Sequence, residues 1–147
     1  MPLVAFAALL LIGMTTAMHY EALRGLYWWL PVIRIPSRTK LLVVIFGAFI
    51  AHALEIAAYG ITFYVMITHL GAGDLTAPQS TSLTGCMYFS AETYTSLGFG
   101  DVTPGGPVRL LVGAEALNGL LLIGWSASFL CISMERFWAT PNHRHMS

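Results

Sequence analysis

The sequence has few charged residues, and neither sign of charge is in excess. Only 10% of its 147 residues are Asp, Glu, Lys or Arg, against about 25% in an ordinary soluble domain. This shortage argues against a small soluble globule, which needs a charged surface. Basic and acidic residues balance at a formal net charge of zero, so nothing indicates nucleic-acid binding.

The chain also lacks the patterns of a disulfide scaffold or of an enzyme. Its two cysteines, Cys86 and Cys131, lie far apart in the sequence, and we expect them to be packing residues. No pairing of a nucleophile with a base, no phosphate-binding loop and no His/Cys cluster indicates catalysis. We therefore expect a protein that is not an enzyme and has no cofactor.

Long apolar runs are what the sequence does have, and a membrane-spanning helix needs about 20 such residues. Three segments are predicted to span: Leu3–Met18, Leu41–Ile67 and Val108–Ile132. The first is short but uncharged, and it lacks the basic start and small-residue cleavage motif of a signal peptide, so we expect it to be retained. A fourth segment, Thr84–Thr95, is too short to cross and is predicted to be re-entrant.

Basic residues predict the orientation. The segment 69–106 contains no Lys or Arg, so the positive-inside rule places it and the N-terminus outside, with residues 20–40 and the C-terminus in the cytoplasm. Tyr27–Trp29 is predicted to lie at the inner interface, either as a short helix or as an anchored loop. This orientation rests on the basic residues that flank the predicted spans: Arg24, Arg34, Arg38, Lys40, Arg136 and Arg144.

Residues 95–104 read TSLGFGDVTP and interrupt the apolar pattern. Gly98 and Gly100 can adopt positive φ, and alternating handedness along a strand can turn successive carbonyls to one side. A ring of such carbonyls can replace the hydration shell of an ion. The carbonyl end of the preceding short helix also favours a cation. One chain cannot close a ring, so this arrangement predicts an oligomer.

This stretch resembles the filter of the potassium-channel pore module, as found in two-helix bacterial potassium channels. Ser96-Leu97-Gly98-Phe99-Gly100-Asp101 is similar to the family's Thr-Val-Gly-Tyr-Gly-Asp, and the resemblance covers about residues 41 to 135. It implies an all-α integral membrane fold: three transmembrane helices, a re-entrant pore helix and a filter loop. It further implies a homotetramer in a bacterial inner (plasma) membrane that passes K⁺ passively, with no small-molecule substrate other than K⁺.

The resemblance also implies roles for single residues. Backbone carbonyls of the filter would coordinate K⁺, and no other metal is expected. Glu92 and Asp101 would share a proton behind the filter, since two carboxylates in contact cannot both ionise cheaply. Thr93 follows Glu92 in the pore helix, Arg109 would open the inner helix, and Gly119 would be its gating hinge. The filter residues are Ser96, Leu97, Gly98, Phe99 and Gly100.

Three positions depart from the family pattern. Ser96 keeps a hydroxyl that can coordinate an ion but is less rigid than threonine. Leu97 is not β-branched, and Phe99 lacks the tyrosine hydroxyl that would bond to the pore helix, where Tyr88 and Phe89 would be its neighbours. We expect a filter held more by packing than by hydrogen bonds, and K⁺ selectivity retained. A poorly selective cation channel is one alternative, and a non-conducting membrane scaffold or auxiliary subunit is another.

Polar residues within the spans complete the sequence predictions. Asn118 could face cavity water or form an interhelical hydrogen bond, and the sequence does not decide between these. Glu115 is predicted to bond to the back of the pore helix, through Thr93 or Thr95, rather than to act as a protonation-sensitive gate. Unpaired carboxylates at such depth are costly.

His52 and Glu55 share a helix face at i, i+3. A metal site would need more ligands than this one pair, so we expect a hydrogen-bonded pair packed against the first span or a neighbouring subunit. A pH-sensing role for His52 is a weaker hypothesis. We divide the chain into an N-terminal helix with a basic linker (1–40), a pore domain (41–136) and a short tail (137–147) that carries solvated histidines.

Overall fold

A computed structural model describes residues 1–76 and 80–138 of the chain. Within them, three helices are long and apolar enough to cross a membrane, which confirms the predicted all-α membrane fold. The elements in chain order are α1 (Pro2–Trp29), α2 (Ser37–Thr68), β1 (Asp74–Leu75), α3 (Leu83–Tyr94), β2 (Pro104–Gly105), a 3₁₀ turn (Gly106–Val108) and α4 (Arg109–Trp138).

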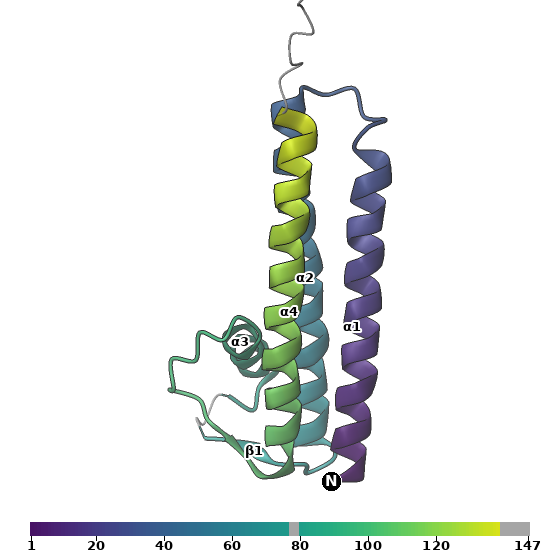
Figure 1. The fold of residues 1–147 in the computed structure, drawn as a ribbon. Helices are drawn as coiled ribbons and strands as arrows, with labels where there is room; N and C mark the ends of the chain where they lie inside the picture. Colours follow the sequence, from purple (N-terminus) through teal and green to yellow (C-terminus); the bar gives the residue numbers. More distant parts are fainter. Residues whose placement is uncertain (77–79, 139–147) are drawn as a thin grey trace, which may run out of the picture.

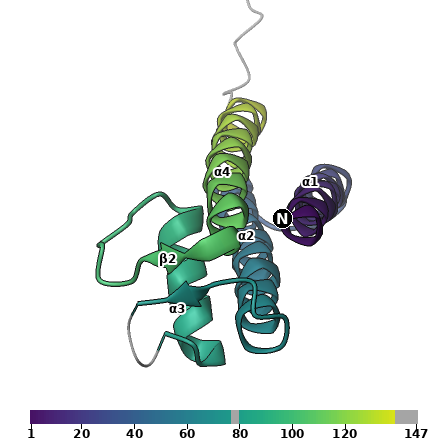
Figure 2. The same cartoon turned by 90° about the horizontal axis from the view of Figure 1, so that it is seen from below.

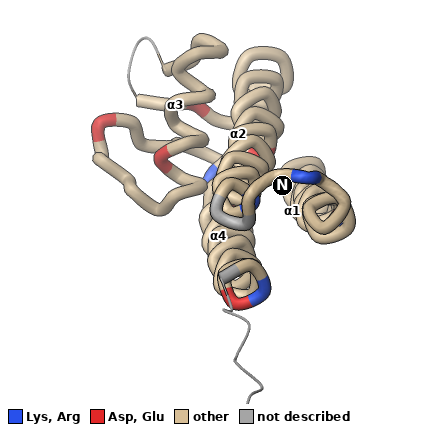
Figure 3. Tube along the Cα trace, turned by 90° about the horizontal axis from the view of Figure 1, so that it is seen from above, with Lys and Arg blue, Asp and Glu red and all other residues tan. Residues whose placement is uncertain are grey.

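The three long helices lie side by side, and the short α3 packs near one end of them (Figure 1). α1 contacts both α2 and α4, whereas α3 lies on the other side of the α2–α4 pair (Figure 2). The N-terminus shares an end with the loop around α3, and the α1–α2 connection and the end of α4 share the opposite end (Figure 1). Charged positions are sparse along all of these helices (Figure 3).

α1 is longer than the sequence predicted. Tyr27–Trp29 forms its last turn, so the predicted separate interfacial helix or loop at this place is wrong. No proline interrupts the helix before Pro31, and continuation to Trp29 satisfies its backbone hydrogen bonds. One stripe of α1 at helical spacing faces the other helices and is buried: Val4, Ala8, Leu11, Thr15, His19 and Leu23.

α3 begins and ends within one residue of its predicted bounds. Its N-cap is Ser82, whose side-chain oxygen accepts a hydrogen bond from the Gly85 amide at 3.0 Å, as serine commonly does at the start of a helix. The helix packs closely on α2, because Gly60 leaves room for Met87 at a point where any Cβ would collide. Both cysteines are free: Cys86 is buried, in keeping with the predicted packing role, whereas Cys131 is exposed in the single subunit.

A short antiparallel ribbon that the sequence did not predict joins the two ends of the loop. Asp74 pairs with Gly105 and Leu75 with Pro104. The amide of Thr76 donates to the Thr103 carbonyl at 3.1 Å, which extends the contact. The ribbon therefore closes the loop beneath α3 and fixes where α4 starts.

Gly119 lies where α4 crosses the end of α3. A Cβ at this position would overlap the carbonyl oxygen of Tyr94 and approach its ring carbon Cγ to 2.9 Å. α4 is one helix from Arg109 to Trp138. The structure thus gives Gly119 a packing role at the end of the pore helix, while its hinge role stays a prediction.

We expect Gly119→Ala to destabilise the protein by about 1–3 kcal/mol, the usual cost of overpacking. Gly113→Ala is the matched control on the same helix, because a Cβ added there would meet no atom within 4 Å. Gly113→Ala should stabilise the protein by up to about 1 kcal/mol, because alanine has a higher helix propensity than glycine. Unfolding midpoints in detergent would measure both effects, and equal midpoints for the two variants would contradict the packing role.

Candidate functional site

The segment after α3 has the alternating backbone that the sequence suggested. φ is positive at Gly98 (50°) and Gly100 (81°), as expected, and also at Ser96 (56°), which was not foreseen. The intervening residues have ordinary φ. Left-handed backbone is costly at a residue with a Cβ, so Ser96 is held there by its surroundings. Left-handed and ordinary backbone conformations therefore alternate residue by residue from Ser96 to Gly100.

The start of this segment is bonded to the last turn of α3. The Ser96 amide donates to the Thr93 carbonyl at 3.0 Å, and the Leu97 amide donates to the Glu92 carbonyl at 2.9 Å. Beyond that point the side chains of Leu97 and Phe99 are 58% and 68% exposed in the single subunit. The extended part therefore has one fixed end and projects from the subunit surface.

Tyr88 bonds to Asp101, one of the two carboxyl groups predicted to lie behind the filter. Its hydroxyl donates to Asp101 Oδ2 at 3.2 Å. The neighbouring Glu92, the largest cause, together with desolvation and the Asp101 contact raises the pKa of Tyr88 to about 12. Among the described residues Glu92 Oε1 is buried without a partner. The shared proton between Glu92 and Asp101 stays a prediction.

Phe89, the other expected neighbour of Phe99, points elsewhere. It is buried, and its ring packs edge-on against Phe63 of α2 at a centroid distance of 5.4 Å. Within one subunit it is therefore part of the core between α2 and α3.

Asn118 forms interhelical hydrogen bonds, which is one of the two alternatives that the sequence left open. Its Nδ2 donates to Thr15 Oγ1 at 2.7 Å and to the Tyr59 hydroxyl at 3.2 Å. The side chain is buried between α1, α2 and α4, so the cavity-facing alternative does not describe this subunit.

Glu115 bonds to the back of α3, as predicted, but through Ser90 rather than Thr93 or Thr95. Ser90 Oγ lies 2.5 Å from Glu115 Oε1 and 2.8 Å from the Ile56 carbonyl oxygen. Ser90 has one hydroxyl proton, and the carbonyl can only accept. Both contacts are hydrogen bonds only if Glu115 is a carboxylic acid that donates to Ser90.

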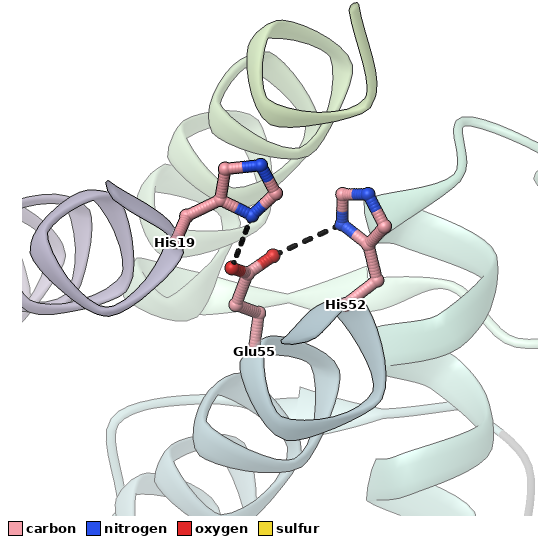
Figure 4. Close-up of side chains that lie close together, drawn as sticks. All are labelled: His19, His52 and Glu55. Carbon is pink, nitrogen blue, oxygen red and sulfur yellow. Dashed lines mark hydrogen bonds and ion pairs between the residues drawn. The ribbon is translucent and has the colours of Figure 1, made fainter. Parts of the chain in front are cut away.

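His52 and Glu55 form the predicted pair, with His52 Nδ1 3.1 Å from Glu55 Oε2. The structure adds a partner that sequence reasoning missed: His19 of α1, whose Nδ1 lies 2.8 Å from Glu55 Oε1 (Figure 4). His19 and Glu55 have no exposed surface. His19 lies just beyond the predicted first span, Leu3–Met18. Its helical spacing from Thr15 is the one sequence signal that indicates an inward-facing side chain.

Two further groups complete this polar network. The hydroxyl of Tyr94, the last residue of α3, donates to Glu55 and lies 2.8 Å from His52 Nδ1. Ser126 Oγ of α4 lies 3.0 Å from His52 Nε2 and 3.1 Å from His19 Nε2. All four helices therefore meet at one buried cluster, and one of its members, Tyr94, lies two residues before the left-handed segment 96–100.

The architecture, with two spans enclosing a short helix and a left-handed extended segment, defines a membrane pore protein. A family model described as "Ion channel" matches residues 39–136, about two thirds of the chain, and the protein belongs to this family. The match agrees with the resemblance to the two-helix pore module and makes the protein an ion channel. No curated protein and no solved structure matches the chain.

Because Glu115 acts as a donor, Glu115→Gln should change the free energy of unfolding by less than about 1 kcal/mol. Ser90→Ala should cost about 1–3 kcal/mol, since it leaves the buried acid unpaired. Ser128→Ala is the matched control, because that hydroxyl bonds only to the Gly124 carbonyl of its own helix. Denaturant unfolding in detergent would measure all three, and a larger loss in Glu115→Gln than in Ser90→Ala would contradict the assignment.

Proposed function

We propose that the protein is a potassium-selective channel subunit that conducts K⁺ passively through a homotetrameric filter. The observation that carries this proposal is the backbone of residues 96–100, where positive φ recurs at every second position. Such alternation can turn successive carbonyls to one side, and rings of carbonyls can replace the hydration shell of K⁺. Ser96 to Gly100 would supply these oxygens.

The exposure of this segment supports assembly. Non-helical backbone at membrane depth is tolerated only where protein buries it or where it lines water. In one subunit Leu97 and Phe99 are uncovered, and so is an apolar face of α4 that includes Leu117, Leu120 and Leu121. Other copies of the chain around a central axis would cover the filter side chains and leave the carbonyls facing the axis. The cavity beneath would be lined by α4.

The remaining predictions fit within this proposal. Residues 41–136 would form the pore domain, residues 1–40 an added helix with a basic linker, and residues 137–147, mostly outside the described residues, a tail. Glu92 and Asp101 would brace the filter with Tyr88, and Gly119 would keep α4 close to the pore helix. The basic end of the bundle would face the cytoplasm of a bacterial cell, and the filter would open outside.

Flux from purified protein in liposomes, with K⁺ and Na⁺ gradients compared side by side, tests selectivity. We expect flux that prefers K⁺ and that Gly98→Ala abolishes, because alanine at φ 50° costs about 1–2 kcal/mol and would turn the carbonyl. Gly71→Ala is the matched control: its φ is 58°, with open space around it, in the loop after α2. It should leave the flux unchanged.

The other outcomes separate the alternatives. Equal K⁺ and Na⁺ flux would retain the pore and reject K⁺ selectivity, which would direct attention to Leu97 and Phe99. Equal loss in the Gly98 and Gly71 variants would mean that the effect is one of folding rather than of the filter. No flux in any protein, together with ion-free filters in an experimental structure, would favour a non-conducting scaffold.

Native mass spectrometry of the detergent-solubilised protein tests assembly separately. We expect a species of four subunits, each of 16.0 kDa, because four copies are what the resemblance implies for a closed filter. Dimers or monomers alone, under conditions that preserve flux in liposomes, would contradict the homotetramer.

A further inference from the structure

The polar network between the four helices has the geometry of a metal-binding site. His19, His52 and Glu55 each offer one ligand atom, and these atoms all lie within 4.8 Å of one another. The cluster lies near the middle of α2, deep in the predicted span. Ionisable residues at such depth are rare and mark functional sites by default.

The spacing of the donors suits a small divalent ion. In a tetrahedral zinc site with bonds of about 2.0–2.1 Å, neighbouring donors are about 3.3 Å apart. Here the contacts from the two Nδ1 atoms to the Glu55 oxygens measure 2.8 and 3.1 Å. These two separations must grow by about 0.2–0.5 Å to admit the ion, while the ligand atoms that lie farthest apart, within 4.8 Å of one another, must draw closer. The Tyr94 hydroxyl, 2.8 Å from His52 Nδ1, is placed to fill the fourth position.

The surroundings of Ser126 provide the second argument. Its oxygen lies between the Nε2 atoms of both histidines. If both Nδ1 atoms coordinate a metal, both Nε2 atoms carry hydrogen, and the two lone pairs of Ser126 Oγ accept both. Metal-ligating histidines almost always donate their other ring N–H to such a partner. Without a metal, Ser126 Oγ can still donate to one Nε2 and accept an N–H from the other, so the metal is distinguished by both Nε2 atoms donating to Ser126.

One side of the cluster reaches the surface on the α2–α4 face. His52 is the one ligand with exposed side-chain surface, 18% in the single subunit. It borders two small apolar cavities of about 180 and 210 Å³, which also contact Ser126 and Tyr94 respectively. The ion could reach the buried donors past the imidazole of His52.

We propose that His19, His52 and Glu55 bind one divalent transition-metal ion per subunit. Imidazole and carboxylate donors in a four-coordinate arrangement favour Zn²⁺. The ion would cross-link α1 to α2 and, through Tyr94, fix the end of the pore helix directly before the filter. This inference goes beyond the proposed K⁺ selectivity, and its test does not depend on flux.

The test uses full-length protein purified with a tag that contains no histidine, stripped with chelator and then titrated with Co²⁺ and Zn²⁺. We expect about one ion per subunit, visible ligand-field bands of four-coordinate Co²⁺, and a melting temperature raised by Zn²⁺, because ligands that bind the folded state stabilise it. Ser126→Ala should weaken binding by about 10–100-fold, as for other outer-shell partners of metal ligands. His19→Gln and Glu55→Gln should weaken it further.

Two controls remove other histidines. His69→Gln changes an exposed residue in the loop after α2, and a double variant of His143 and His145 removes the histidines of the tail. Both should bind the metal like the wild type. Binding that survives in His19→Gln and Glu55→Gln, or that disappears with the tail histidines, would overturn the proposal. The absence of Co²⁺ bands in the wild-type protein would also overturn the proposal. This result does not depend on whether any variant folds. If metal-free wild-type protein showed pH-dependent flux, and His19→Gln removed this pH dependence, the cluster would bind a proton instead of a metal ion.

Discussion

Every polar group inside a membrane needs a partner within the protein, and the packing of this channel depends on that constraint. Glu55, Glu115 and Asn118 all lie on the spans that enclose the pore helix. Each one has at least one hydrogen-bond partner on a different helix. Apolar faces alone would leave helices free to slide in lipid, since lipid tails are as apolar as leucine. Directional hydrogen bonds fix their register.

α1 shows this most clearly. The family match begins at residue 39 and leaves α1 out. Yet Thr15 and His19, one helical turn apart, supply partners for Asn118 on α4 and Glu55 on α2. In packing, α1 is therefore part of the pore bundle rather than an appended anchor. Whatever changes the position of α1 also changes the surroundings of Tyr94.

Tyr94 is the point where the polar and steric constraints meet. Its hydroxyl bonds to Glu55, and its backbone carbonyl lies against Gly119 of α4. α3 ends here and the left-handed segment begins two residues later. An extended backbone with few internal hydrogen bonds needs a fixed starting point, and this residue provides one. The geometry of residues 96–100 thus depends on two helices, α2 and α4, that contribute no residue to this segment.

The sequence by itself determined the membrane class, the bounds of α3 and the positive φ of Gly98 and Gly100, because apolar length, capping residues and glycine are local signals. It also paired His52 with Glu55, since i, i+3 spacing is local. Only the tertiary structure decided that Glu115 bonds to Ser90, that Asn118 bonds to Thr15 and Tyr59, and that α1 continues to Trp29. The sequence did not place His19, Tyr94 and Ser126 in the buried polar cluster, because each bonds to a residue on another helix. These bonded residues are 36 to 107 positions apart in the sequence. Helical periodicity shows which face of a helix is buried, but which side chain meets it from a neighbouring helix depends on how the helices pack.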